Sequence, residues 1–235
     1  MVVNRIYFFL FILTIALVIL LSINSSQNKD SYIEAKDEIA LIYNEFFADN
    51  ETDKNIYLCL GSNNLNKIGS FFTNQTKQSK WLIIFIEPNE FYSDALFELK
   101  SKLNKFNRRV LIYESTISWL HDGEIDFYVN KTNKSYGSIN PSYKLDSNFE
   151  SKKIRSIDVD SVLKIFSIKD NVTVEIDLNG AEYFVIQYLI RNESIKLIDN
   201  IKASFSTNAS TIFYRSDDVF RSLFEAYGIK SLFWH

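Results

Sequence analysis

The chain has 235 residues, 46% of them hydrophobic and 15% aromatic, which is enough for the core of one α/β domain. Its net charge of −3, with lysines and arginines spread along the sequence, excludes a basic stripe for nucleic acid. One cysteine and two distant histidines exclude a disulfide framework and argue against a metal site built on these residues. We therefore expect neither a nucleic-acid partner nor a bound metal.

The N-terminal region has the pattern of a membrane anchor. Residues 6–23 form an uncharged apolar run of roughly the 18 or more residues that a bilayer-crossing helix needs. A cleaved signal peptide is the alternative, but SINSSQN matches the small-residue cleavage pattern poorly. Residues 1–5, which include Arg5, would form a cytoplasmic tail. The stalk at 24–30 and the domain at 31–235 would then be lumenal or extracellular. We expect a type II membrane protein.

Glycosylation signals support that orientation. The pattern N-x-[ST] is the acceptor for N-linked glycans, and chance would place it roughly three times in this chain. It occurs at Asn24, Asn50, Asn74, Asn130, Asn133, Asn171, Asn192 and Asn208. The excess predicts a glycoprotein of the secretory pathway, although an asparagine-rich composition also produces unused sites.

The first half of the domain alternates between helix and strand. Apolar residues at helical spacing predict a helix within 31–47. The continuous apolar runs at 56–61 and 80–88 predict buried parallel strands. An amphipathic helix at 89–104 and a third strand at 108–116 follow.

The second half continues the alternation after an insertion. Residues 121–130 predict a turn and a strand, and residues 131–153 read as an irregular insertion. The later strands are expected at 154–158, 172–177, within 195–206 and at 229–235, with helices at 161–166, 181–192 and 218–228. This order predicts one Rossmann-like α/β domain with helices on both faces of the sheet.

Two strand ends have the residues of a nucleoside site. Gly61 follows the first strand, where glycine lets the backbone turn tightly and approach a ligand. Glu87 ends the second strand, where an acid can accept hydrogen bonds from ribose hydroxyls. Their spacing of 26 residues is close to the roughly 20 of dinucleotide-binding folds. Alternatively, Gly61 only ends its strand and Glu87 is a solvent-exposed acid at a strand end, with no role in binding.

The chain resembles a known family over residues 55–205. The segments that carry the likeness are LCLGSNN, WLIIFIEPNE, VLIYESTIS, HDGEIDFYV, IRSIDVDSVL and VEIDLNGAEYFVIQYL, in that order. They resemble the FkbM-type S-adenosylmethionine-dependent methyltransferases, whose glycine loop reads D-x-G-A-N and whose later motif reads K-I-D-x-E-G-A-E. The resemblance implies a class I methyltransferase sheet and S-adenosylmethionine as the cofactor.

The resemblance also implies roles for individual residues. Gly61, Ser62 and Asn63 would line the methionine and ribose of the cofactor, and Glu87 would hold the ribose. The remaining expected cofactor contacts are Pro88 and Asn89 at the turn after Glu87, and Ser115 and Thr116 near the adenine.

The acceptor would lie at the carboxyl end of the strand expected at 172–177. Asp177 is the expected base for the acceptor hydroxyl of a small molecule or glycan, and Glu182 is the second candidate. A helix N-terminal carboxylate is an equally good interpretation of Glu182. Gly180 would allow the sharp turn from this strand into the next helix.

Two departures from the family leave activity open. Cys59 stands where the family has an aspartate, and Asn179 stands where it has a glutamate. Each change removes a carboxylate, so a degenerate domain that binds partners without catalysis is an alternative. We expect Cys59 to act as a small buried hydrophobe.

A type II membrane glycosyltransferase is the second alternative. Asp158-Val159-Asp160 matches the D-x-D pattern that binds a metal and a sugar diphosphate. The same residues also fit the end of a strand followed by Asp160 as a helix N-cap, which we favour. His121 could act as a base, but the adjacent Asp122-Gly123 favours a hairpin turn.

Overall fold

The computed structural model describes residues 35–47, 54–62, 65–74, 79–104, 107–205 and 216–234. The expected tail, anchor and stalk, and the site candidate Asn63, lie outside these residues. Among the described helices, none has both the length and the apolar character needed to cross a bilayer.

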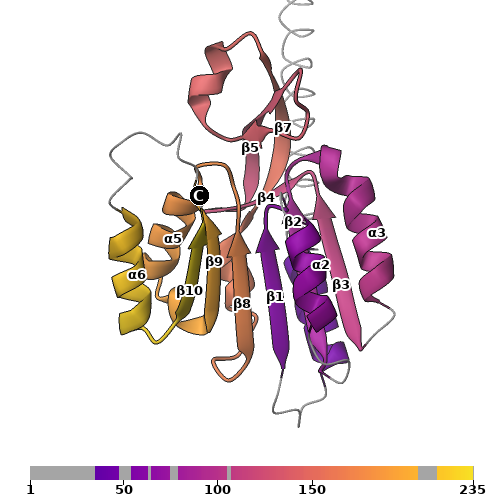
Figure 1. The fold of residues 1–235 in the computed structure, drawn as a ribbon, viewed down its shortest axis with the longest axis vertical. Helices are drawn as coiled ribbons and strands as arrows, with labels where there is room; N and C mark the ends of the chain where they lie inside the picture. The colour runs from indigo at the N-terminus through magenta and orange to yellow at the C-terminus, as the bar shows by residue number, and fades with distance from the viewer. Residues whose placement is uncertain are drawn as a thin grey trace, which may run out of the picture.

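Six parallel strands form the main sheet (Figure 1). In spatial order the strands are β10, β9, β8, β1, β2 and β3. Their bounds are β1 Asn55–Leu60, β2 Trp81–Glu87, β3 Arg108–Glu114, β8 Asn171–Ile176, β9 Asn200–Ser204 and β10 Lys230–Trp234. The chain builds outward from β1 to β3 and then crosses to β8 on the other side of β1. The strand order therefore reverses between β1 and β8, which is where open α/β sheets bind ligands.

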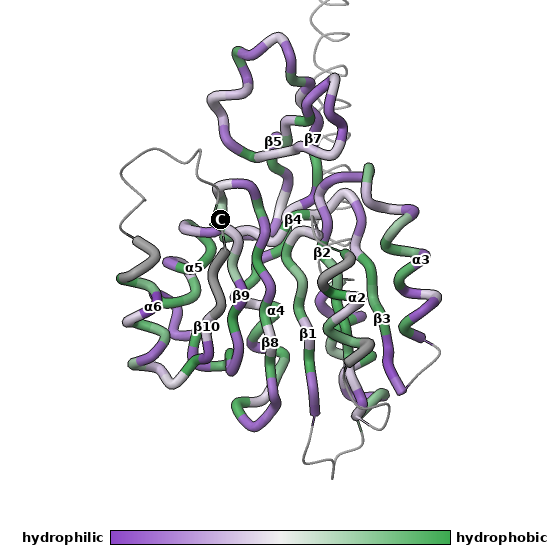
Figure 2. The backbone as a smooth tube through the Cα atoms, in the orientation of Figure 1, coloured by the Kyte–Doolittle hydropathy of each residue, from purple (hydrophilic) through white to green (hydrophobic). Residues whose placement is uncertain are grey.

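The strands of this sheet are apolar because both faces are covered. Every residue of β2 is buried, and β1 and β8 are each buried at five of six positions. Side chains alternate between the faces, so Leu58 packs in the larger hydrophobic core and Cys59 in the smaller one. Figure 2 shows the resulting hydrophobic centre of the sheet.

Helices cover both faces and confirm the expected Rossmann-like architecture. α2 (Leu65–Asn74) and α3 (Ser93–Leu103) enclose the smaller core. The larger core packs against a helix at residues 35–46 and against α4 (Val159–Leu163), α5 (Glu182–Arg191) and α6 (Ser216–Ala226). Single-turn 3₁₀ helices occur at Glu90–Tyr92 and Ser194–Leu197.

A second sheet extends from the edge at which the main strands end, which we call the carboxyl edge. Its order is β4 (Thr116–Trp119), β7 (Phe149–Asp158), β5 (Gly123–Asn130) and β6 (Gly137–Ser138). Figure 1 shows β5 and β7 rising as a projecting arm, and Figure 2 shows that the arm is mostly hydrophilic. The segment 131–153, expected to be irregular, contains β6, a 3₁₀ helix at Pro141–Leu145 and half of β7. The strand is hard to recognise in the sequence because seven of the ten β7 positions are half-buried or exposed, and polar residues occupy most of them.

The cap of α4 differs from the expected one. Asp158, and not Asp160, is the N-cap, because the Asp158 side chain accepts a hydrogen bond from the Asp160 amide at 3.1 Å. Asp160 lies in the first turn, where Lys164 pairs with it at 2.6 Å. A prediction from composition places such a cap only to within a residue or two.

Candidate functional site

The backbone closes tightly where β1 ends. Gly61 has a φ of +81°, and a Cβ atom there would lie 2.0 Å from the carbonyl oxygen of Asp177. Only glycine avoids that overlap. The Gly61 amide donates to the Ile86 carbonyl at 3.0 Å, and the Asp177 amide donates to the Leu60 carbonyl at 2.9 Å. The ends of β2, β1 and β8 are therefore fastened side by side.

Glu87 links the ends of β2 and β1. Its carboxylate is almost fully buried, and Oε2 accepts from both the amide, at 2.6 Å, and the hydroxyl of Ser62. Oε1 accepts from the Asn89 amide at 2.6 Å. Burial raises the pKa of Glu87 to about 7, although the hydrogen bonds from Ser62 and Asn89 oppose the rise. Because a carboxylate offers about four acceptor positions, these three donors leave about one for a ligand.

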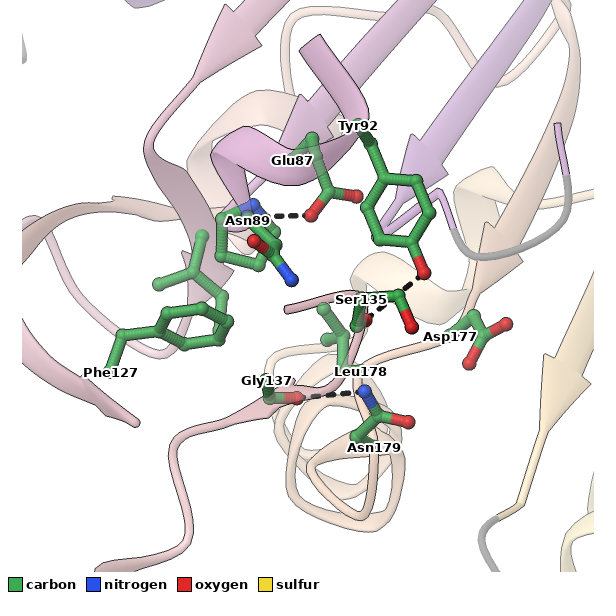
Figure 3. A pocket seen from close by; sticks show the side chains of 12 residues that line it. Glu87, Asn89, Tyr92, Phe127, Ser135, Gly137, Asp177, Leu178 and Asn179 are labelled. Carbon is green, nitrogen blue, oxygen red and sulfur yellow. Dashed lines mark hydrogen bonds between the residues drawn. The ribbon is translucent and has the colours of Figure 1, made fainter. Parts of the chain in front are cut away.

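The turn after Glu87 carries two polar side chains toward the arm. Asn89 caps the 3₁₀ helix by accepting from the Phe91 amide at 3.1 Å, and its Nδ2 donates to the Lys134 carbonyl at 2.8 Å. The Tyr92 hydroxyl donates to the Ser135 carbonyl at 3.0 Å (Figure 3). This turn therefore holds the loop between β5 and β6.

The junction of β8 and α5 is a sharp turn closed by a buried acid. Asn179 and Gly180 have φ values of +51° and +100°, which explains the glycine at the second position. Glu182 is fully buried and accepts from the Leu178 amide at 2.6 Å and the Gly180 amide at 2.8 Å. Its carboxylate therefore stabilises the turn and the start of α5.

The three strand ends and the arm surround one hollow (Figure 3). Its lining residues are Gly61, Glu87, Pro88, Asn89, Tyr92, Ile117, Phe127, Ser135, Gly137, Asp177, Leu178 and Asn179. Its cavity volume is about 10 Å³, room for about one water molecule. A small-molecule pocket usually measures roughly 300 Å³ or more, so the hollow is closed in this conformation.

Residues 134–138, which we call the lid, close the hollow. Besides the bonds from Asn89 and Tyr92, the Asn179 Nδ2 donates to the Gly137 carbonyl at 2.7 Å. The Ser138 hydroxyl returns a bond to the Asn179 carbonyl at 3.1 Å. A Cβ atom at Gly137 would lie 2.3 Å from the Phe127 ring, so glycine lets the lid lie against β5.

The structure brings most of the predicted site residues together. Five of them line the hollow, namely Gly61, Glu87, Pro88, Asn89 and Asp177. Ser62 lies behind Glu87 and contacts it directly. Ser115, Thr116 and Glu182 do not line the hollow.

Local contacts account for the two residues expected near the adenine. The Ser115 hydroxyl donates to Glu90 at 2.8 Å, and Ser115 takes a φ of +47°. Thr116 is fully buried, and its hydroxyl donates to the Glu114 carbonyl at 2.8 Å. Both residues therefore shape the passage from β3 into β4.

Sequence reasoning missed the residues that the arm and the 3₁₀ helix contribute. Tyr92, Phe127 and Gly137 line the hollow, and none of them has a predicted site role. Two signals were usable: Phe127 lies in the segment HDGEIDFYV, which contributes to the resemblance, and Gly137 is one of six glycines in the chain, in a segment expected to be irregular.

The two departures from the family pattern have different structural consequences. Cys59 is fully buried in the smaller core, and burial raises the pKa of its thiol, as for a small hydrophobe. Asn179 donates to the lid, which a glutamate carboxylate could not do. Asn179 therefore contributes a bond that holds the lid closed.

The D-x-D segment and His121 lie outside the hollow. Asp158 accepts from the Ser161 hydroxyl at 2.6 Å and the Tyr188 hydroxyl at 3.2 Å in addition to its capping bond. Within the described part of the chain, no group of three or more metal-ligating side chains is found. His121 is exposed at the turn between β4 and β5.

Comparisons with known protein families, curated proteins and solved structures found no match to this chain.

Gly61→Ala should destabilise the fold by about 3 kcal/mol, because the new methyl group overlaps the β8 backbone and the left-handed φ adds strain. Gly69→Ala is the matched control. Gly69 lies within α2, where an added Cβ meets only Leu99 at 3.6 Å, so it should be neutral or stabilising. Urea unfolding of both variants measures the difference, and equal stabilities would contradict the close approach at Gly61.

The raised pKa of Glu87 predicts a pH-dependent stability. Its folded pKa lies above the ordinary value of 4.5, so the folded state retains a proton that the unfolded state releases. This contribution is fully present below pH 4.5 and is lost as the pH rises to about 7. The free energy of unfolding of Glu87→Ala, measured from pH 4.5 to 8, should fall less steeply than that of the unsubstituted chain. Parallel profiles would show that Glu87 is ionised throughout this range.

Proposed function

We propose that the protein is a membrane-anchored, lumenal methyltransferase of the FkbM-like class I type that uses S-adenosylmethionine. One observation carries the proposal. The ends of β1, β2 and β8 meet around a single hollow at the point where the strand order reverses. A nucleoside and a methyl acceptor would need a glycine turn and two acids at this point. Gly61 supplies the turn after β1, Glu87 is the acid at the end of β2, and Asp177 is the acid after β8.

The residues around the hollow fit a nucleoside in a particular way. Glu87 has about one acceptor position left, so a ribose with two hydroxyls would also displace one present donor. The Ser62 hydroxyl is the donor that can rotate away, whereas the amides of Ser62 and Asn89 are fixed by the backbone. Gly61 leaves the backbone uncovered for the methionine portion.

Bound S-adenosylmethionine would supply a methyl group on a sulfonium. Gly61 and Glu87 would hold the cofactor, whose methyl group would pass from sulfur to the acceptor oxygen and leave an uncharged thioether. The protein aligns the two reactants and removes the hydroxyl proton. Asp177, half-buried at the hollow, would accept that proton. The acceptor would be a small molecule or a glycan.

The lid must open before a cofactor can enter. Four hydrogen bonds join it to the turns after β2 and β8, and each contributes roughly 1 kcal/mol in net terms. Only molecules with an open lid can bind the cofactor. The apparent Kd is therefore the intrinsic Kd divided by the fraction of molecules whose lid is open.

A non-catalytic binding domain is the second candidate. The closed hollow, the satisfied Glu87 carboxylate and the Asn179 bond to the lid favour it. Such a domain would keep the fold without binding the cofactor. The glycosyltransferase alternative has no comparable support, because Asp158 is committed to capping α4.

The proposed location rests on the sequence. The apolar run at 6–23 would anchor the chain, and Arg5 would keep its N-terminus in the cytoplasm. The domain would then face the lumen of the secretory pathway or the cell exterior.

Calorimetry with S-adenosylhomocysteine tests the nucleoside site. Glu87→Ala should abolish measurable binding, because it removes the acceptor for the ribose. Glu90→Ala is the control, since Glu90 is a neighbouring acid that pairs with Ser115 and Lys152 outside the hollow. Absence of binding by the unsubstituted chain at millimolar ligand would instead favour the non-catalytic candidate.

Releasing one lid contact should tighten that binding. Tyr92→Phe removes the hydroxyl that donates to Ser135, so the open lid gains about 1 kcal/mol relative to the closed one and Kd falls about fivefold. Tyr188→Phe, which removes a hydroxyl bonded to Asp158 at the start of α4 and away from the lid, is the matched control. If both variants bind alike, the lid does not compete with the ligand.

A further inference from the structure

The described part of the chain starts at the carboxyl edge of the main sheet. The helix at residues 35–46 begins beside the end of β3, where the Tyr113 hydroxyl donates to the Ala35 carbonyl at 3.3 Å. Lys36 pairs with Asp122 at the base of the arm. The other end of this helix lies near the start of β2, where Lys80 donates to the Phe46 carbonyl at 3.4 Å. An anchor that precedes residue 35 would therefore be attached to the domain at the carboxyl edge of the main sheet, where the hollow lies.

The linker between the apolar run and this helix is short. Residues 24–34 span at most about 40 Å when fully extended. The arm extends from the same edge, and the eight residues of β5 measure about 26 Å. The domain cannot lie more than about 40 Å from the bilayer, and the arm covers much of that distance. The arm can therefore reach the bilayer when the linker is not fully extended.

The end of the arm has the composition of a surface that contacts lipid head groups. Leu145, at the end of the 3₁₀ helix, is 94% exposed, the highest value among the large hydrophobic side chains of the described residues. Residues 131–150 contain three lysines, Lys131, Lys134 and Lys144, and two acids, of which Glu150 pairs with Lys134, so Lys144 next to Leu145 keeps its charge available. Basic residues around an exposed apolar group suit a membrane interface.

Aromatic packing keeps this end of the arm in place. The Tyr143 ring stacks on Phe149 with centroids 4.2 Å apart, and its hydroxyl bonds to that of Tyr136 at 2.9 Å. Tyrosine is enriched where proteins meet the head-group region of a bilayer. Leu145 is therefore presented from a packed base.

From these features we propose that the tip of the arm, residues 141–145, rests on the bilayer in which residues 6–23 are anchored. The hollow then faces the membrane, and the acceptor is a membrane-associated molecule. This inference rests on the proposed anchor. It does not depend on methyl transfer, because a non-catalytic domain would sit in the same orientation.

Depth-sensitive fluorescence tests the contact. The full chain carrying Leu145→Cys is labelled with an environment-sensitive nitrobenzoxadiazole dye and reconstituted into phosphatidylcholine vesicles containing a nitroxide-labelled lipid. Cys59 is fully buried and should not react. Ile168→Cys is the matched control, because Ile168 is 70% exposed in the loop before β8, at the opposite edge.

We expect a blue-shifted and lipid-quenched emission at position 145, and an unshifted, unquenched emission at position 168. Equal quenching at both positions, or none at position 145, would overturn the proposed contact. Flotation of the same samples reports on the anchor separately. A full chain that fails to float with the vesicles would overturn both the anchor and this orientation, and would leave the nucleoside site to its own calorimetric test.

Discussion

The close approach of two backbones at Gly61 is the constraint on which the candidate site depends. A side chain at this position would overlap the Asp177 carbonyl, so β1 and β8 could not end together. The same residue bonds to β2 through its amide. Three strand ends therefore meet within hydrogen-bonding distance, and a glutamate and an aspartate lie at one edge of the sheet. Without this junction, no arrangement of the later loops would form a shared hollow.

The hollow is closed by parts of the chain that are distant in sequence. The turn after β2 and the turn after β8 each donate an amide or hydroxyl hydrogen to carbonyl oxygens of the lid. A ligand would therefore compete with the lid for the side chains of Asn89, Tyr92 and Asn179. Asn179 is the informative member, because its amide supports the closed state in a way that a carboxylate cannot. An active enzyme and a non-catalytic domain would differ in how easily these bonds are exchanged.

The main sheet could be predicted because its strands are continuous apolar runs that end in a glycine or an acid. Residues 56–61 and 80–88 were expected as strands and contain nearly all of β1 and β2. Gly61 and Glu87 are predicted from their places at strand ends and Asp177 from the family resemblance, and the structure brings the three together. The resemblance to a methyltransferase family stays a prediction, because one fold serves many unrelated functions.

The arm and the lid could not be predicted for physical reasons. β7 reads FESKKIRSID, with three apolar residues among seven charged or polar ones, so its composition resembles that of a loop. The lid contacts use the backbone carbonyls of Lys134, Ser135 and Gly137, and a carbonyl is present at every position of the chain. The N-cap of α4 shows the same difficulty on a smaller scale. Asp158 and Asp160 both have a side chain that can cap a helix, and only the backbone geometry shows that Asp158 does so.

Hydrogen exchange of the full chain, with and without S-adenosylhomocysteine, tests the central claim most directly. If a nucleoside sits over the joined strand ends, exchange should slow at residues 61–62 and 87–92, and the lid at 134–138 should change in the same titration. Unchanged exchange in these three segments at saturating ligand, or protection confined to another part of the chain, would contradict the account.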